Sequence, residues 1–470
     1  MRPPAEITLS TATSATLPDL PDGLPLPQRY WAMLVIALAI VLAVLDSSIA
    51  NVALPTIAHT LHADAASSIW IVNAYQLAIV VSLLPLSSLG EIIGYRRIYL
   101  AGLALFTVAS LGCALSDSLL TLTLARTIQG FGAAGVMSVN IALVRLTFPQ
   151  HMLGRGISLN ASVVAISTAI GPSIASAILA VAHWPWLFAV NVPLGLAAYT
   201  IGRWALPASA IQPRRFDIPS AILNALTFGL LIVTVDGFSH GESRALVAAE
   251  IVATLAIGAA FVRRQLSQPS PLLPVDLLRL PIFALSIGTS VCSFIAQMLA
   301  FVSLPFYFQD TLGLSQVQTG LLMTPWPLVI VVIAPISGYL SDRYSAGVLG
   351  GIGLATMALS LALLATMPAH PQTIEIVWRM ALCGLGFGLF QSPNNRAILA
   401  AAPHHRSGGA SGMLSTARMT GQSLGAALVA LIFSAAGPSG TTTTLIVAAG
   451  FAALAAFVSL TRIKAHPRPA

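Results

Sequence analysis

Charged residues are scarce in this chain of 470 residues. Asp, Glu, Lys and Arg together make up 8% of it, against roughly 25% in an ordinary soluble domain. Hydrophobic residues make up 56%, and the mean hydropathy is +0.87. A soluble fold of this composition would expose large apolar patches and aggregate. The composition therefore argues against a soluble protein and predicts one embedded in a lipid bilayer.

Lysine and cysteine are also rare. Lys464 is the one lysine, and no Gly-x-x-x-x-Gly-Lys-Ser/Thr motif is present, so the sequence gives no support for an ATP-driven pump. Cys113, Cys292 and Cys383 lie in apolar stretches without metal-ligand spacing, which argues against a disulfide framework or a metal site. The net charge of +7 comes from scattered basic residues, a pattern typical of membrane topology rather than of a nucleic-acid surface. We expect no cofactor.

What the chain has instead is a series of apolar runs of about 20 residues, the length of a membrane-spanning helix. Strands of a membrane barrel would alternate over about 10 residues, so the runs predict an all-α membrane protein. We expect fourteen transmembrane helices, at 31–54, 68–90, 98–116, 119–147, 154–181, 185–206, 217–238, 244–263, 281–307, 315–341, 347–367, 374–401, 407–434 and 441–461.

Arginines fix the expected orientation, because positive residues collect on the cytoplasmic side. With a cytoplasmic N-terminus, nearly all of them fall in cytoplasmic connections and tails, and Arg244 alone lies outside. Both termini are then cytoplasmic. The predicted parts are a disordered tail (1–30), a six-helix bundle (31–206), linkers with two extra transmembrane helices (207–280), a second six-helix bundle (281–462) and a tail (463–470).

An internal echo supports two related halves. The second span ends in a stretch from Ser87 to Arg97, and the tenth ends in a stretch from Gly338 to Arg343. Each places an acid beside a basic turn. Two pseudo-symmetric bundles with a site between them are a recurrent plan of transporters.

Five stretches together resemble the major facilitator superfamily, specifically its fourteen-span drug:proton antiporter branch. The resemblance covers nearly the whole chain after the tail. The loop stretch departs from the family pattern, with Ser87, Glu91 and Tyr95 where Gly, Asp and Arg are common, and the antiporter stretch has fewer glycines. The stretches are Leu45 to Pro55, Ser87 to Arg97, Leu122 to Gly130, Ser167 to Pro172 and Trp184 to Gly195.

Asp46 is a lone acid in the first apolar run, where a charge costs roughly 2.5–3.5 kcal/mol on insertion scales. We predict that it couples transport to protons, in the outer portion of a central cavity; the alternative is an acid that holds neighbouring helices together. Arg126 lies deep in the fourth run and is its expected counter-charge. The resemblance implies that Arg126 senses or promotes protonation of a nearby carboxylate. Its alternative role is donation to helix carbonyls.

Further residues are candidates for the moving parts. We expect Glu91, Arg96 and Arg97, with Asp342 and Arg343 in the second half, to form cytoplasmic gates; plain topology anchoring is the alternative. Gly171 and Pro172 predict a bend in the fifth span, because proline removes a backbone hydrogen bond and glycine permits close packing. A passive kink would leave the same pattern. Candidate cavity residues are Asn51, Tyr75, Gln76, Asp310, Gln391, Asn394, Asn395 and Arg418.

The sequence thus predicts a monomeric secondary transporter of the bacterial inner membrane. It would export hydrophobic drugs or toxic compounds in exchange for protons by alternating access. The substrate would be small and either hydrophobic or cationic. The expected partners are a small substrate, protons and the bilayer. A proton-coupled exporter of one endogenous metabolite, lipid or antibiotic fits equally. An enzyme is not expected, because the sequence shows no nucleophile, metal cluster or paired-carboxylate site. A non-transporting membrane receptor is the remaining alternative, which cargo-stimulated proton movement would exclude.

Overall fold

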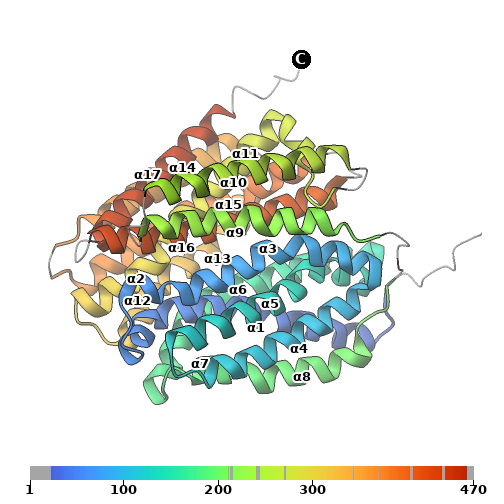
Figure 1. Ribbon diagram of the computed structural model, residues 1–470, viewed down its shortest axis with the longest axis horizontal. Helices are drawn as coiled ribbons and strands as arrows, with labels where there is room; N and C mark the ends of the chain where they lie inside the picture. The colour runs from blue at the N-terminus through green and yellow to red at the C-terminus, as the bar shows by residue number, and fades with distance from the viewer. Residues whose placement is uncertain are drawn as a thin grey trace, which may run out of the picture.

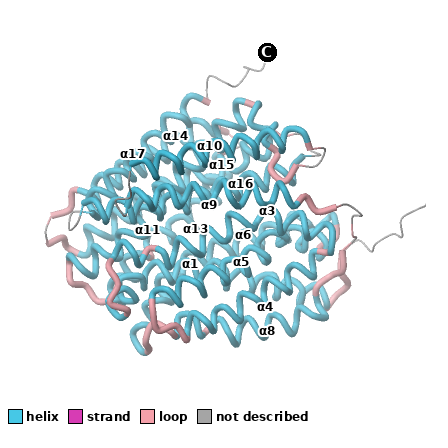
Figure 2. Tube along the Cα trace, viewed as in Figure 1, coloured by secondary structure: helices cyan, strands magenta, loops and turns pink. Residues whose placement is uncertain are grey.

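The computed structural model describes residues 23–209, 211, 215–239, 244–268, 271–341, 343–368, 370–402, 406–436 and 440–462. These residues form helices and short connections, with no strand among them (Figure 2). The all-α membrane fold predicted from composition is therefore confirmed.

The first part of the chain forms a series of helices, whose boundaries include a glycine turn and a capped helix start. Gly94 has a φ of +105° and turns the chain sharply between α3 and α4, a conformation that glycine adopts without strain. Ser118 and Thr121 cap the start of α5 reciprocally. The helices are α1 (Gln28–Thr60), α2 (Ala65–Ser68), α3 (Trp70–Ile93), α4 (Tyr95–Ala114), α5 (Leu119–Thr147), η1 (Gln150–Met152), α6 (Leu153–Val181), α7 (Trp186–Ala189) and α8 (Asn191–Ala205).

The last part of the chain has a similar series. Ser315 and Gln318 cap α12 reciprocally, and Pro325 separates α12 from α13. The helices are α11 (Pro281–Phe306), η3 (Tyr307–Thr311), α12 (Gln316–Met323), α13 (Pro325–Leu340), α14 (Ala346–Ala365), α15 (Thr373–Ala401), α16 (Ser407–Ala436) and α17 (Gly440–Thr461).

Two further helices, α9 (Ile218–Ser239) and α10 (Arg244–Ser267), lie between these series, followed by η2 (Val275–Arg279). Arg264 Nη2 donates to Asp217 Oδ1 at 2.7 Å and ties the start of α9 to the end of α10. Partial burial opposes ionisation of Asp217, but hydrogen bonds from Ser220 and Arg264 outweigh it and lower the pKa of this carboxyl group. α9 packs on both α3 and α16, and so bridges the two helix series on one face of the molecule (Figure 1).

Thirteen helical segments of the described chain are long and apolar enough to cross a membrane. They match thirteen of the fourteen expected spans in order and position. The expected span at 185–206 is present in two pieces, α7 and α8, so neither piece reaches the length of a full span.

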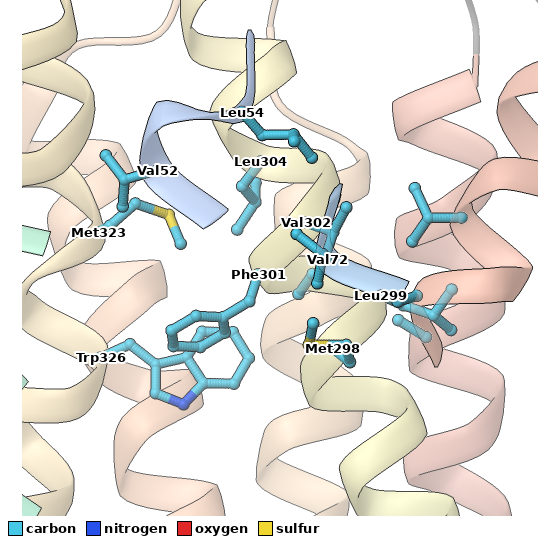
Figure 3. Packing of buried hydrophobic residues seen from close by; sticks show 14 of the residues in the cluster. Val52, Leu54, Val72, Met298, Leu299, Phe301, Val302, Leu304, Met323 and Trp326 are labelled. Atoms are coloured by element: carbon cyan, nitrogen blue, oxygen red, sulfur yellow. The ribbon is translucent and has the colours of Figure 1, made fainter. Parts of the chain in front are cut away.

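The apolar core is continuous at one end of the molecule and divided at the other. Near the Thr60 end of α1, one cluster joins both helix series: Val52, Leu54 and Val72 pack beside Met298 and Phe301 (Figure 3). Toward the Gln28 end, one cluster comes from α1, α3, α4, α5 and α8 together with Met419 of α16, and a separate one surrounds Phe283. The two series are therefore sealed together by apolar contacts at the Thr60 end, which is the predicted external end.

Candidate functional site

Asp46 and Arg126 form an ion pair deep inside the first helix series. Arg126 Nη1 donates to Asp46 Oδ2, and both side chains are about 1% exposed. Arg126 Nε also donates to the carbonyl of Ile71 at 3.1 Å. The contact between the two residues expected from the sequence is confirmed. Because a charge buried alone is costly, each partner stabilises the other in place.

Two amide side chains complete the surroundings of Asp46. Gln129 Nε2 donates to Asp46 Oδ1 at 2.9 Å, and Asn191 Nδ2 donates to the same oxygen at 2.8 Å. Gln129 Oε1 in turn accepts from Arg126 Nη1 at 2.6 Å. The carboxylate is thus held by hydrogen-bond donors from α5 and α8.

Tyr75 of α3 stands directly beside this pair. The Arg126 guanidinium lies 4.1 Å from the centre of the Tyr75 ring, a distance at which cation–π attraction operates. The Tyr75 hydroxyl donates to the carbonyl of Ala43 on α1 at 3.1 Å. Tyr75 therefore contacts the ion pair through its ring and the helix of Asp46 through its hydroxyl.

A cavity of about 120 Å³ lies on the other side of Tyr75, between the two helix series. Its wall combines apolar side chains with amides and hydroxyls, as small-molecule sites do. Among the described residues, no group of His, Cys, Asp or Glu has the arrangement of a metal site. The lining residues are Ala43, Val44, Ser47, Ser48, Asn51, Tyr75, Gln76, Ile79, Met137, Val164, Thr168, Gln297, Met298, Phe301, Arg418, Met419 and Gln422.

Four of the expected cavity residues do line this cavity: Asn51, Tyr75, Gln76 and Arg418. Whether they bind substrate stays a prediction. Asp46 does not line it, and the expectation that it would is wrong. The cavity face of α1 carries Ser47 and Asn51, and Asp46 points from another face toward α5 and α8.

Asp310 is also outside the cavity, although it was expected there. It follows α11 at the Thr60 end, where its Oδ1 lies 2.9 Å from His59 Nε2. Nearby, Thr56 Oγ1 donates to Gln309 Oε1 at 3.0 Å. These contacts join α1 to η3, so Asp310 belongs to the seal between the two series.

Asn394 is buried in the second series. Arg462 Nη1 donates to Asn394 Oδ1 at 2.6 Å and to Ser286 Oγ at 2.9 Å, and Asn394 Nδ2 donates to Ser290 Oγ at 2.8 Å. Asn394 thus satisfies a buried arginine and is absent from the cavity wall, as are Gln391 and Asn395. Burial also lowers the pKa of Arg462 to about 10.

Gly171 and Pro172 lie where α6 meets both α1 and the second series. A Cβ at Gly171 would come within 2.4 Å of Ser48 Oγ, and a Cβ at Gly320 of α12 within 2.5 Å of the Pro172 carbonyl. Ser173 Oγ and Thr324 Oγ1 are 2.8 Å apart across the same contact. The pair therefore sits at a tight crossing of helices; its role in bending stays a prediction.

The expected gate residues lie at the predicted cytoplasmic ends. Arg96 donates from Nη2 to the carbonyl of Arg203 at the end of α8, and Arg97 donates to that of Ile93. Arg343 Nη2 donates to Tyr339 Oη at 2.8 Å. Asp342 falls outside the described residues. The gating role, which includes Glu91, stays a prediction.

Gln129 and Asn191 were not selected from the sequence as site residues. Gln129 lies three residues after Arg126 on one helix, so both face the same way, and this spacing was a usable signal. Asn191 gave a weaker signal, since only the break between α7 and α8 aims it at Asp46. Gln297 of the cavity wall was also not selected, whereas Gln422 lies one turn from Arg418, a spacing readable from the sequence.

The chain is similar in sequence to proteins named as transporters or exporters. The chain is 61% identical over 444 residues to an uncharacterized transporter, YebQ, of Escherichia coli (strain K12), covering 94% of this chain and 97% of that protein. It is 31% identical to the riboflavin transporter RibZ of Clostridioides difficile (87% of this chain, 89% of that protein). It is 32% identical to a tetracenomycin C resistance and export protein of Streptomyces glaucescens (86% and 76%).

The fold is similar to that of a crystallised POT family transporter in complex with a thioalcohol-conjugated peptide, with a TM-score of 0.71 and 16% identity over 92% of this chain and 96% of that one. The family model of the Major Facilitator Superfamily matches residues 36–426 and 287–470. The chain is a transporter and belongs to the major facilitator superfamily.

Proposed function

We propose that this transporter exports hydrophobic drugs or other toxic compounds across the bacterial inner membrane in exchange for protons. The observation that carries the proposal is the buried Asp46–Arg126 pair beside Tyr75, whose ring contacts Arg126 and which also lines the cavity. An intramembrane ion pair is expensive, and in transporters such pairs mark ion pathways.

The coupling would run through Tyr75 and α1. Protonation of Asp46 neutralises the carboxylate and weakens its hold on Arg126, whose guanidinium contacts the Tyr75 ring. Tyr75 and Ser47 both line the cavity. A cargo that presses on these residues would therefore favour one arrangement of the ion pair, and a proton on Asp46 would favour another. Coupling between cargo and proton requires this kind of differential contact.

Alternating access would come from rocking of two bundles, 31–206 and 281–462, about the cavity. Apolar contacts and the Thr56–Gln309 and Ser173–Thr324 hydrogen bonds join these bundles at the Thr60 end. With both termini cytoplasmic, this is the external end, so the arrangement is closed outward. Glu91 and its basic neighbours would close the opposite end in the other state.

An alternative is export of one endogenous metabolite by the same mechanism. The tetracenomycin C exporter among the relatives favours drug export, whereas the riboflavin transporter favours a single metabolite. A resistance profile after expression in a pump-deficient bacterial strain separates the two, since only a drug exporter protects against several unrelated compounds.

The test is an Asp46→Asn variant in proteoliposomes that contain a pH-sensitive dye. A panel of hydrophobic antibiotics and dyes is added, and the proton movement that each compound stimulates is recorded. We expect the wild type to move protons in response to at least one compound and the variant to bind that compound without moving protons. Asp217→Asn removes an acid outside the spans and serves as the matched control. Uphill export by a well-folded Asp46→Asn variant would overturn the proposal.

A further inference from the structure

Arg418 of α16 is the charged residue of the cavity wall. The described lining residues include no acid, and Asp46 is turned away and already paired with Arg126. The cavity therefore has a formal charge of +1. A wall of this sign attracts an anion and repels a cation, and low-dielectric surroundings strengthen both effects.

Arg418 also lacks the partners that Arg126 and Arg462 have. Its Nε atom is buried and has no hydrogen-bond partner in the described structure. Arg126 is paired with Asp46, and Arg462 is satisfied by Asn394, Ser286 and Ser459. A buried donor without an acceptor costs free energy, most of all when it is charged. An acidic group bound in the cavity beside Arg418 would balance this charge.

The other residues of the cavity wall indicate which further chemical groups a bound molecule should have. Ile79, Met298, Phe301 and Met419 offer apolar surface, and Gln297 and Gln422 offer amides. Ser47 and Asn51 add a hydroxyl and an amide to the wall. A cargo with an apolar body, one acidic group and a hydroxyl or amide group would complement this lining.

We infer that the cavity selects an amphiphilic anion, an apolar small molecule whose carboxylate or similar acidic group is bound by the guanidinium of Arg418. The planar fork of arginine matches the two oxygens of a carboxylate, which a neutral or cationic cargo does not supply. The inference rests on the proposed function, because it names the class of compound that the exporter carries.

The test uses three probes with one apolar body: 2-naphthoate, 2-naphthalenemethanol and 2-naphthylmethylammonium. Equilibrium binding to the purified full chain in detergent is measured by calorimetry. We expect the wild type to bind the carboxylate most tightly and the ammonium least. Arg418→Gln should weaken carboxylate binding roughly tenfold or more, the scale of one charge-assisted hydrogen bond, and leave the alcohol unchanged. Arg418→Lys should retain part of the preference.

Arg379→Gln is the matched control. Arg379 lies on α15, outside the cavity wall, and its Nε is also buried without a partner. This variant makes the same change in net charge, and its carboxylate binding should equal that of the wild type. Melting temperatures confirm that each variant is folded. Three results would each overturn the inference. The wild type could bind the ammonium most tightly, it could fail to bind the carboxylate, or Arg418→Gln could bind the carboxylate with unchanged affinity.

The binding assay stands apart from proton coupling. If Arg418 binds the carboxylate probe but no compound stimulates proton movement in proteoliposomes, the anion site is supported and proton-coupled export is rejected. If compounds drive protons but Arg418→Gln binds the carboxylate as the wild type does, proton-coupled export stands and the anion site falls.

Discussion

Gln129 joins the two charges of the site through one amide group: its Nε2 donates to Asp46 Oδ1 at 2.9 Å, and its Oε1 accepts from Arg126 Nη1 at 2.6 Å. An amide in this position holds the acid and the base at a fixed distance. Its removal should therefore loosen the ion pair.

Gln129→Leu should weaken the coupling of transport to protons. Asp46 loses a hydrogen-bond donor and Arg126 loses an acceptor, so the two charges are held less firmly in place. The measurement is cargo-stimulated proton movement in proteoliposomes, which should fall relative to the wild type. Ser110→Ala is the control, because Ser110 Oγ contacts Gln129 Nε2 at 2.9 Å without touching Asp46. Equal proton movement in Gln129→Leu and wild type would contradict the prediction.

Arg126→Gln should be strongly destabilising at neutral pH, because it leaves Asp46 buried without a counter-charge, at a cost of about 3–5 kcal/mol. Asp46→Asn combined with Arg126→Gln should recover much of the stability and none of the coupling.

A double-mutant cycle in thermal melting measures this coupling free energy. If the two single variants and the double variant are additive, the ion pair contributes nothing to stability and the prediction fails.

Gly320→Ala should disturb the seal at the Thr60 end. The added Cβ would lie 2.5 Å from the Pro172 carbonyl, so α12 and α6 must separate. We expect the population to shift toward an arrangement open at that end, seen as faster labelling of an Asn51→Cys variant by a maleimide added from the external side.

Gly338→Ala is the matched control for that experiment, since a Cβ at Gly338 meets no atom within 4 Å. Equal labelling rates in Gly320→Ala and Gly338→Ala would show that the α6–α12 contact does not govern access.

The sequence allowed the helical membrane fold to be predicted well, because apolar runs of a span's length report directly on the bilayer. It also allowed the contact between Asp46 and Arg126 to be predicted, because a charge within an apolar helix requires an opposite charge nearby. It could not tell which face of α1 carries the cavity. That helix is apolar on all sides, so its rotation depends on tertiary contacts such as Asn191 to Asp46.

The polar residues of the second half show the same limit. Asn394 and Arg418 are both polar residues within apolar helices, and sequence alone offers no means to separate them. Contacts do: Asn394 is satisfied by Arg462 and Ser290, and Arg418 faces a cavity. A buried polar side chain is a candidate for binding only when its own hydrogen bonds are left unfilled.

The position of α9 across α3 and α16 has a consequence for how cargo enters from the lipid. α3 and α16 show almost no exposed large apolar side chain, with Ile93 of α3 the exception among the described residues, whereas α6 and α13 expose Ile166, Ile170, Leu328 and Val332. The junction of α6 with α12 and α13 therefore has apolar side chains at the molecular surface, and that of α3 with α16 is covered by α9. A cargo dissolved in the bilayer would find entry between α3 and α16 blocked by α9.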